Sequence, residues 1–338
     1  MKMLFLAGLV ILIIVASAVI VTIGQVPMTV AQVYGTVFSK LWPGLFQVDP
    51  LVSHVVWKIR LPLIVGAIMA GSGLGICGCV MQTVLKNPMA SPFTLGISSG
   101  AHFGVSIAAV FGVSIMGGPY LLVGNAFVCA LLCSGCIIAL SMIRGATSET
   151  LVLAGIAVNY LFQALNELLN YIATDEQRAL MSYWGMGSLG DLNWRSILFM
   201  GVGSIVCLVL LYVKIWDLNL MTVGDESAQS MGVNPQRTRL FVMVVASLLV
   251  STIVAFIGVI GFIGLIAPHI GRIVIGNDHR YLLPASCGIG ASLLLIANAV
   301  ATNLLGSSVI PTGLVMSILG VPLFLYLILR GKRREYWA

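Results

Sequence analysis

Long apolar runs without a charged residue are the main pattern in this chain. The seven longest cover residues 3–39, 61–85, 87–143, 150–166, 196–213, 240–271 and 281–329. A bilayer core about 30 Å thick takes roughly 20 helical residues to cross, so the shorter runs hold one span each and the longest hold two. Strands of a membrane barrel would instead alternate apolar and polar positions over short segments. The pattern therefore predicts an all-α, polytopic membrane protein.

Glycines, prolines and charge clusters divide these runs into ten candidate membrane helices. We expect them at about residues 4–24, 62–84, 93–112, 119–142, 150–173, 195–214, 237–257, 259–275, 281–303 and 312–330. The first could be a secretory signal ending at Ala16-Ser17-Ala18. Its apolar run continues past that tripeptide and is too long for a signal core, which favours a retained span. Together the helices are predicted to form one transmembrane domain over residues 1–338.

The distribution of basic residues predicts the orientation. An even number of spans places both termini on one side. On that side we expect Lys2, Lys86, Arg144, Lys214, Arg237, Arg239, Arg272, Arg280, Arg330, Lys332, Arg333 and Arg334, and on the other Lys40, Lys58, Arg60, Arg178 and Arg195. Because cytoplasmic loops carry the excess of Lys and Arg, both termini are expected in the cytoplasm. The net charge of +6 is thereby explained by topology, and no nucleic-acid partner is expected.

Three segments between the spans are long enough to carry function. Two are predicted outside, at about 25–60 and 174–194, and one inside, at about 215–235. The inner segment is typical of a short helix, a turn at Gly224, and a second short helix that ends near Gly232. Asp225 and Glu226 would lie in the first turn of the second helix, where the helix dipole favours acidic groups. Such a pair indicates a docking site for another protein, with a solvated loop as the alternative.

The fifth span carries an unusual stripe of amides. Asn159, Gln163, Asn166 and Asn170 fall within about 60° of one another on a helix, and Glu167 lies beside them. Amides facing lipid would be left without hydrogen-bond partners, so the stripe should face other helices or a water-filled path. A translocation path is the favoured interpretation, and hydrogen bonding between helices is the alternative.

Composition and missing motifs exclude several function classes. Only 8% of residues are charged and 59% are hydrophobic, which excludes an ordinary soluble domain. No phosphate-binding loop, zinc-protease motif or paired intramembrane carboxylate is present. The seven cysteines lie in apolar segments without nearby ligand residues, and the four histidines are scattered. We therefore expect no catalytic residues, no metal site and no cofactor bound by this chain.

Several motifs resemble one family of transporters. They are Arg60-Leu61-Pro62, the glycine-rich run 71–82, Lys86-Asn87-Pro88-Met89, residues 184–189, 232–239 and 258–272, Asp278-His279-Arg280 and Pro311-Thr312-Gly313. In this order they resemble the FecCD-type permeases, the membrane subunits of type II ABC importers for ferric siderophores, haem and cobalamin. The resemblance covers nearly the whole chain.

The resemblance implies a type II ABC importer permease architecture and a set of partners. These are a second permease subunit, identical or a paralogue, two separate ATPase subunits that use ATP, an extracytoplasmic substrate-binding protein, and the lipid of a prokaryotic plasma membrane. It also assigns roles to residues. Gly224, Asp225 and Glu226 would contact the ATPase, Asn87 and Met89 would narrow the inner mouth with Thr147 and Ser148, and the fifth span would line the path.

The chain departs from the family at its outer surface. Leu63 replaces the second arginine of a common Arg-Leu-Pro-Arg motif, and Asn298 and Thr302 replace an acidic and a basic residue. In the family such arginines meet acids on the binding protein. Because only Arg60 and Lys58 remain as basic residues for this contact, we expect docking of the binding protein to be weaker or to use other residues.

An importer permease for an iron chelate is the leading hypothesis. Haem and cobalamin are the alternative substrates within the class. A stand-alone secondary transporter would need inverted repeats and an intramembrane ion site. A membrane enzyme would need a catalytic constellation near a membrane face. The sequence shows neither.

Overall fold

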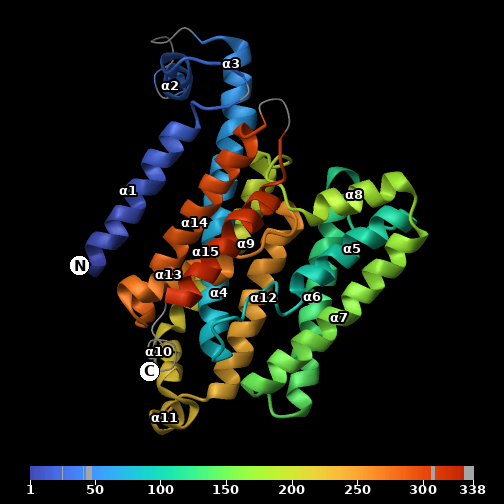
Figure 1. The fold of residues 1–338 in the computed structure, drawn as a ribbon, viewed down its shortest axis with the longest axis vertical. Coiled ribbons are helices and arrows are strands. Elements are labelled where there is room, and N and C mark those ends of the chain that lie inside the picture. The colour runs from blue at the N-terminus through green and yellow to red at the C-terminus, as the bar shows by residue number, and fades with distance from the viewer. Residues whose placement is uncertain (25, 41, 43–47, 306–308, 331–338) are drawn as a thin grey trace.

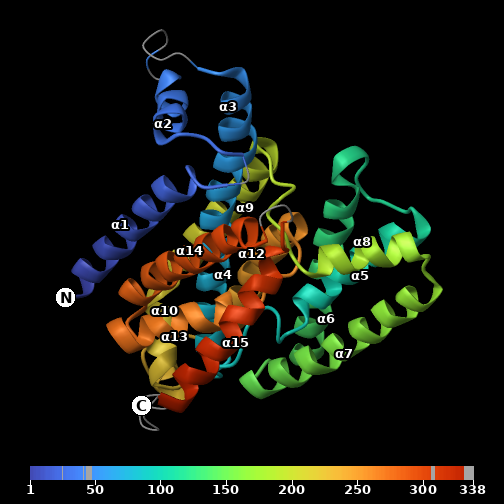
Figure 2. The ribbon, with the colours of Figure 1, turned by 45° about the horizontal axis from the view of Figure 1, so that its top comes forward.

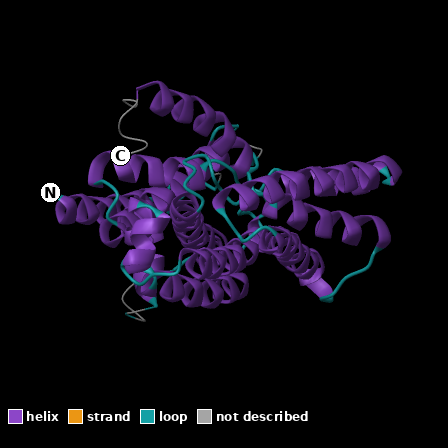
Figure 3. Ribbon diagram, turned by 90° about the horizontal axis from the view of Figure 1, so that it is seen from below, coloured by secondary structure: helices purple, strands orange, loops and turns teal. Residues whose placement is uncertain are grey.

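The computed structural model describes residues 1–24, 26–40, 42, 48–305 and 309–330. Within these ranges every regular element is a helix (Figure 3). The predicted basic cluster Lys332, Arg333 and Arg334 lies outside the described residues, as does part of the outer segment at 43–47. The all-α fold class is confirmed.

Each of the ten predicted membrane helices is present. They are α1 (Lys2–Ile20), α4 (Leu61–Val84), α5 (Ile97–Phe111), α6 (Leu121–Ile143), α7 (Ser148–Ile172), α9 (Trp194–Val213), α12 (Pro235–Ile257), α13 (Ile263–Ile275), α14 (His279–Asn303) and α15 (Thr312–Arg330). Among the described residues, seven helices are long and apolar enough to cross a membrane, and α5, α13 and α15 are shorter apolar helices.

Several boundaries differ from the prediction: α1 ends four residues early and α5 begins four residues late, and the starts of α4 and α13 have identifiable causes. The helix expected from about 62 begins twelve residues earlier, because α3 (Pro50–His54) and the π-helical turn η1 (Val55–Arg60) run directly into α4. The helix expected from 259 begins only at Ile263. Gly258 has a φ of 70° and Phe262 a φ of 67°, and these left-handed residues separate α12 from α13.

The segments between the spans also form helices. α2 (Val30–Ser39) and α3 lie at one end of the molecule, and α10 (Ile215–Val223) and α11 (Asp225–Ser230) lie at the opposite end (Figure 1). A short 3-10 turn, η2 (Gly118–Tyr120), precedes α6. The sequence did not predict α8 (Asp175–Gly185), although Thr174 and Gln177 form a capping box at its start.

Helix α4 is the centre of the larger part of the fold, where α9, α12, α13 and α14 pack around it. Its glycines allow close backbone approach. A Cβ on Gly71 would lie 2.3 Å from the Gly290 carbonyl oxygen of α14, and one on Gly78 would lie 1.8 Å from that of Gly264 on α13. Small residues at helix crossings serve this purpose in membranes.

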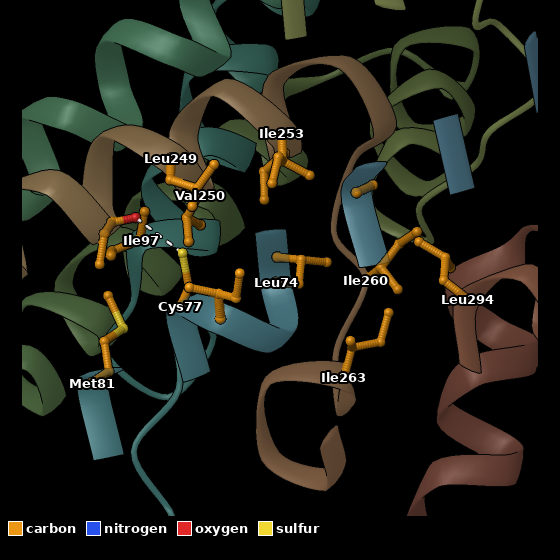
Figure 4. Packing of buried hydrophobic residues seen from close by; sticks show 14 of the residues in the cluster. Leu74, Cys77, Met81, Ile97, Leu249, Val250, Ile253, Ile260, Ile263 and Leu294 are labelled. Carbon is orange, nitrogen blue, oxygen red and sulfur yellow. Dashed lines mark hydrogen bonds between the residues drawn. The ribbon is translucent and has the colours of Figure 1, made fainter. Parts of the chain in front are cut away.

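Buried side chains fill the space between α4 and α12. In Figure 4, Leu74 and Cys77 of α4 lie against Leu249, Val250 and Ile253 of α12. The Cys77 thiol donates to the Ala246 carbonyl oxygen at 3.5 Å. Cysteines at such positions act as small packing residues.

A second group of helices, α5 to α8, lies beside this central part (Figure 2). Within the group α5 contacts α6, α7 and α8, and α6 packs against α12 to join the two parts. The polar face of α7 is therefore placed at the edge of the cavity described next.

Candidate translocation path and inner coupling site

A cavity of about 700 Å³ lies between α5, α7 and α8 and the loop that follows α12. Its polar lining comes mainly from α7, with Gln163, Glu167 and Asn170, and from α5, with Ser99 and His102. Met181, Ser182 and Gly185 of α8 and Val259 close other sides. A polar, roomy cavity of this kind holds water.

The four amides of the predicted stripe divide into two pairs. Ser99 Oγ donates to Asn159 Oδ1 at 2.6 Å, and Ser106 Oγ donates to Asn166 Oδ1 at 2.8 Å. Asn166 Nδ2 also donates to the Ser99 carbonyl oxygen at 3.1 Å. These two asparagines therefore bond α7 to α5, as the alternative interpretation expected.

Asn166 still reaches the cavity lining, but the other pair is available to the cavity without a partner on α5. Gln163 and Asn170 are exposed, and both contribute to the lining, with Glu167 beside them. The pathway role of the stripe stays a prediction, and the geometry restricts its free amides to Gln163 and Asn170.

His102 fixes the position of α8 over the cavity. Its Nε2 lies 3.1 Å from the Met181 carbonyl oxygen, and its ring stacks on Trp184 with centroids 6.0 Å apart. The scattered histidines gave no indication of this contact, because the two partners are about 80 residues apart in the sequence.

At the opposite end, Arg239 of α12 connects three segments. Its Nε donates to the Val84 carbonyl oxygen at 2.8 Å, and its Nη1 donates to the Ala146 carbonyl oxygen at 3.2 Å. Its Nη2 donates to both carboxylate oxygens of Asp225, at 3.0 and 3.2 Å. The side chain is only 2% exposed. The end of α4, the loop before α7 and the start of α11 are therefore joined through one guanidinium.

The two halves of the predicted inner gate lie on either side of this arginine. Ser148 is buried, and its Oγ donates to the Val84 carbonyl oxygen at 3.3 Å, whereas Thr147 caps α7 and is exposed. Met89 is 54% exposed, and its N–H donates to Asn87 Oδ1 at 2.9 Å. Ser148 is thus bonded to the end of α4 and does not project into open space. The gating role stays a prediction.

The inner helix pair has the predicted shape. α10 and α11 meet at Gly224, which has a φ of 136°, and Gly232, with a φ of 85°, follows the end of α11. Residues with these φ values are normally glycines.

The two acids of α11 have different surroundings. Asp225 pairs with Arg239 and with Lys86, whose Nζ lies 3.0 Å from Asp225 Oδ1. Burial alone would raise the pKa of Asp225, but hydrogen bonds from Arg239 and Lys86 outweigh it and lower the pKa. Glu226 is exposed and forms no ion pair within the described part of the chain. Glu226 is therefore the acid with a charge free for another protein.

A second network holds α10 to the spans. The ring nitrogens of His279, a buried residue of α14, lie 2.8 Å from Thr83 Oγ1 and 2.8 Å from Asn219 Oδ1. Asn219 Nδ2 also donates to Asp278 Oδ1 at 3.1 Å. The Asp278-His279-Arg280 motif marked this position in the sequence, without indicating its contacts.

The outer arginine has an internal role. Arg60 is 7% exposed, and its Nη1 and Nη2 donate to the carbonyl oxygens of Val21, at 2.8 Å, and Val26, at 2.7 Å. The docking role expected for Arg60 needs a charge exposed at the surface, and this expectation is corrected. The guanidinium points inward and bonds to the segment that follows α1. Lys58 is exposed, and its docking role stays a prediction.

Asn298 and Thr302, which replace charged residues of the family, lie close to Arg60. All three line one outer pocket of about 260 Å³, together with Leu63. Thr312 Oγ1 donates to Asn298 Oδ1 at 3.3 Å. With no acid among these neighbours, Arg60 bonds to backbone carbonyl groups.

Comparison with known proteins connects this geometry to a family. The FecCD transport family matches residues 9–330. A protein of Methanocaldococcus jannaschii that is named as an ABC transporter permease is 42% identical over 342 residues, covering 98% of this chain and 96% of the relative. The hemin transport system permease of Yersinia pestis is 37% identical over 300 residues, covering 88% and 89%.

A solved structure extends the likeness to the fold. The structure of an ABC transporter that is described as of a metal-chelate type, in an inward-facing conformation, has a TM-score of 0.83 at 30% identity. The match covers 96% of this chain and 99% of that one. The importer permease architecture expected from the motifs is confirmed.

Proposed function

This chain belongs to the FecCD transport family, and from that premise we propose that it forms the translocation path of an ATP-driven importer for an iron chelate, a ferric siderophore. The observation that carries the proposal is the cavity of about 700 Å³ beside α7. Gln163 and Asn170 offer hydrogen-bond donors and acceptors without fixed charge. Such groups keep a passage hydrated without holding a polar substrate tightly, and a tight site midway would trap it.

The proposal includes the rest of the transporter. A second permease subunit, identical or a paralogue, completes the path, and two separate ATPase chains bind and hydrolyse ATP. An extracytoplasmic binding protein delivers the substrate. The chain lies in a prokaryotic plasma membrane with both termini in the cytoplasm, which places α10 and α11 on the side of the ATPases. The excess of basic residues predicted for that side supports this orientation.

Haem and cobalamin are the alternative substrates, and haem is favoured by the relative in Yersinia pestis that is named for hemin transport. Uptake by proteoliposomes that contain the whole transporter separates the siderophore from haem. We expect ATP-dependent uptake of a ferric siderophore and no uptake of hemin. The opposite result would make the chain a haem permease.

Cysteine accessibility tests the path itself. In a background without native cysteines, Gln163→Cys and Asn170→Cys should react readily with small water-soluble thiol reagents. Leu161→Cys and Leu168→Cys, on the apolar face of α7, should react far more slowly. Asn166→Cys should react at an intermediate rate, because that residue reaches the lining but is largely buried against α5. Equal protection at all of these positions would place the path on another helix.

A further inference from the structure

Glu167 is the one carboxylate in the described lining of the cavity. Its side chain is exposed and forms no hydrogen bond or ion pair within the ranges that the structure describes. An unpaired acid within a span is costly, and such residues mark substrate or ion pathways. Its charge therefore acts on whatever occupies the cavity.

The neighbouring polar groups leave this charge uncompensated. Ser98, Ser99, Gln163 and Asn170 carry no charge, and His102 is engaged by the Met181 carbonyl oxygen. The lining contributed by this chain is therefore electronegative.

Arg178, a basic residue of α8 that is not part of the lining, already has partners. Arg178 of α8 pairs with Asp175 at 3.1 Å, and its Nε donates to the Asn170 carbonyl oxygen at 2.9 Å. Glu176, in the same turn of α8, adds a further negative charge outside the lining. The charges of Asp175, Glu176 and Arg178 together are thus not positive and do not reverse the sign of the cavity.

Glu167 lies close to the end of α7 that leads into α8. It precedes the last residue, Ile172, by five positions, which at the helical rise corresponds to about 7 Å. In the proposed orientation this end faces outward. A substrate coming from outside would meet this carboxylate early.

We propose that Glu167 makes the outer part of the cavity selective for neutral and cationic chelates over anionic ones of the same size. The inference rests on the proposed function, because it assigns a substrate class to the same cavity. Charges of one sign in a cleft with low-dielectric walls concentrate ions of the opposite sign and repel like charges. Ferric trishydroxamates, in which three singly charged ligand groups cancel Fe³⁺, fit this class. Ferric tricatecholates, with a net charge of −3, do not.

The test measures the sign of the field without needing the native substrate. Asn170→Cys in a cysteine-free background is treated with two methanethiosulfonates of similar size, ethyltrimethylammonium and ethylsulfonate, in the membrane-embedded transporter. Each rate is divided by the rate with free 2-mercaptoethanol. We expect the cationic reagent to be favoured and Glu167→Gln to lower the normalised cation-to-anion ratio about tenfold. Glu176→Gln removes an equal charge outside the lining, so it is the matched control and should lower the ratio far less than Glu167→Gln.

The outcomes separate the two proposals. A reactive Asn170→Cys whose ratio does not change with Glu167→Gln would overturn the charge selectivity and leave the path intact. An unreactive Asn170→Cys would overturn the path itself.

Transport by the same variants provides a second readout. A ferric trishydroxamate with a free ammonium group is compared with its N-succinyl derivative, and the binding protein is kept constant. We expect Glu167→Gln to raise, several-fold, the uptake of the anionic N-succinyl derivative relative to that of the ammonium compound. An unchanged uptake ratio would contradict the inference.

Discussion

Asp225 and Arg239 form a charge pair between a half-exposed carboxylate on α11 and a buried guanidinium on α12. Asp225→Ala would leave Arg239 buried with only the two backbone carbonyl partners. Removing the partner of a buried charge is costly because that charge stays out of water, but the cost is smaller here because Asp225 itself is partly in water. We expect a loss of about 2 kcal/mol in the free energy of unfolding, between the values for exposed and buried pairs, measured by denaturant titration of the solubilised permease.

Glu226→Ala is the matched control, since Glu226 is the next residue and is exposed. Surface substitutions of this kind usually change stability by no more than about 0.5 kcal/mol. Equal effects of the two substitutions would show that the Arg239 pair does not stabilise the fold.

The pKa of Asp225 predicts how this contribution depends on pH. Burial opposes ionisation, but the hydrogen bonds from Arg239 and Lys86 lower the pKa below its ordinary value of 3.8. A lowered pKa means that the stabilisation is fully present above the ordinary value and is lost as the pH falls through the folded-state value. The stability difference between the native chain and Asp225→Asn should therefore be constant from neutral pH to about pH 5, and should shrink below 3.8. A difference that disappears already near neutral pH would contradict this.

Individual arginines show what the sequence could not predict. The family resemblance assigned Arg60 to docking at the outer surface, and the distribution of basic residues placed Arg239 on the inner side. Both are buried and donate to backbone carbonyl groups from segments distant in sequence. Nothing local to either arginine specifies those acceptors, since they lie at helix ends and in loops that only the fold brings together.

At the scale of helices, the α4 crossings depend on the absence of side chains. A Cβ at Gly78 would lie 1.8 Å from the Gly264 carbonyl oxygen, so Gly78→Ala forces α4 and α13 apart. Overpacking of this kind typically costs about 1–3 kcal/mol, and we expect the upper end of that range in the same denaturant titration.

Gly135→Ala on α6 is the control for the substitution itself. A Cβ there meets nothing within 4 Å, so alanine should stabilise the helix by roughly 0.5–1 kcal/mol. If Gly78→Ala changed the free energy of unfolding as Gly135→Ala does, α4 and α13 could not cross as closely as described.

Hydropathy predicted the ten membrane helices well, because a span must satisfy its backbone within itself and must be apolar over its length. It did not predict α8, which is amphipathic, although its capping box was visible at Thr174 and Gln177. The amide stripe on α7 was partly predictable. Helical periodicity places four amides on one face, but that face is shared between α5 and the cavity, and only the packing of α5 decides which amides remain free.

For the whole transporter, the different surroundings of Asp225 and Glu226 predict which acid couples the permease to its ATPase. Asp225 is paired within the chain, and Glu226 is exposed. Glu226→Lys should abolish ATPase binding and uptake while membrane insertion and stability are kept, because the side chain is exposed and has no internal partner within the described chain. Coupled ATPase activity in proteoliposomes measures this.

Glu176→Lys, an acid reversal at the opposite end of the molecule, should leave the coupled ATPase activity intact. If Glu226→Lys also left it intact, the docking role of α11 would be refuted.

Arg239 binds the start of α11, the end of α4 and the loop before α7 with one side chain. Coupling through these contacts is reciprocal between the ATPase side and the inner mouth of the path. By thermodynamic linkage, if binding of nucleotide to the ATPases shifts the inner mouth by a given free energy, a substrate that occupies the mouth must change the affinity for nucleotide by the same factor. The arrival of substrate would then be transmitted to the ATPases through the same Arg239 contacts that move the inner mouth, and no separate sensor would be needed.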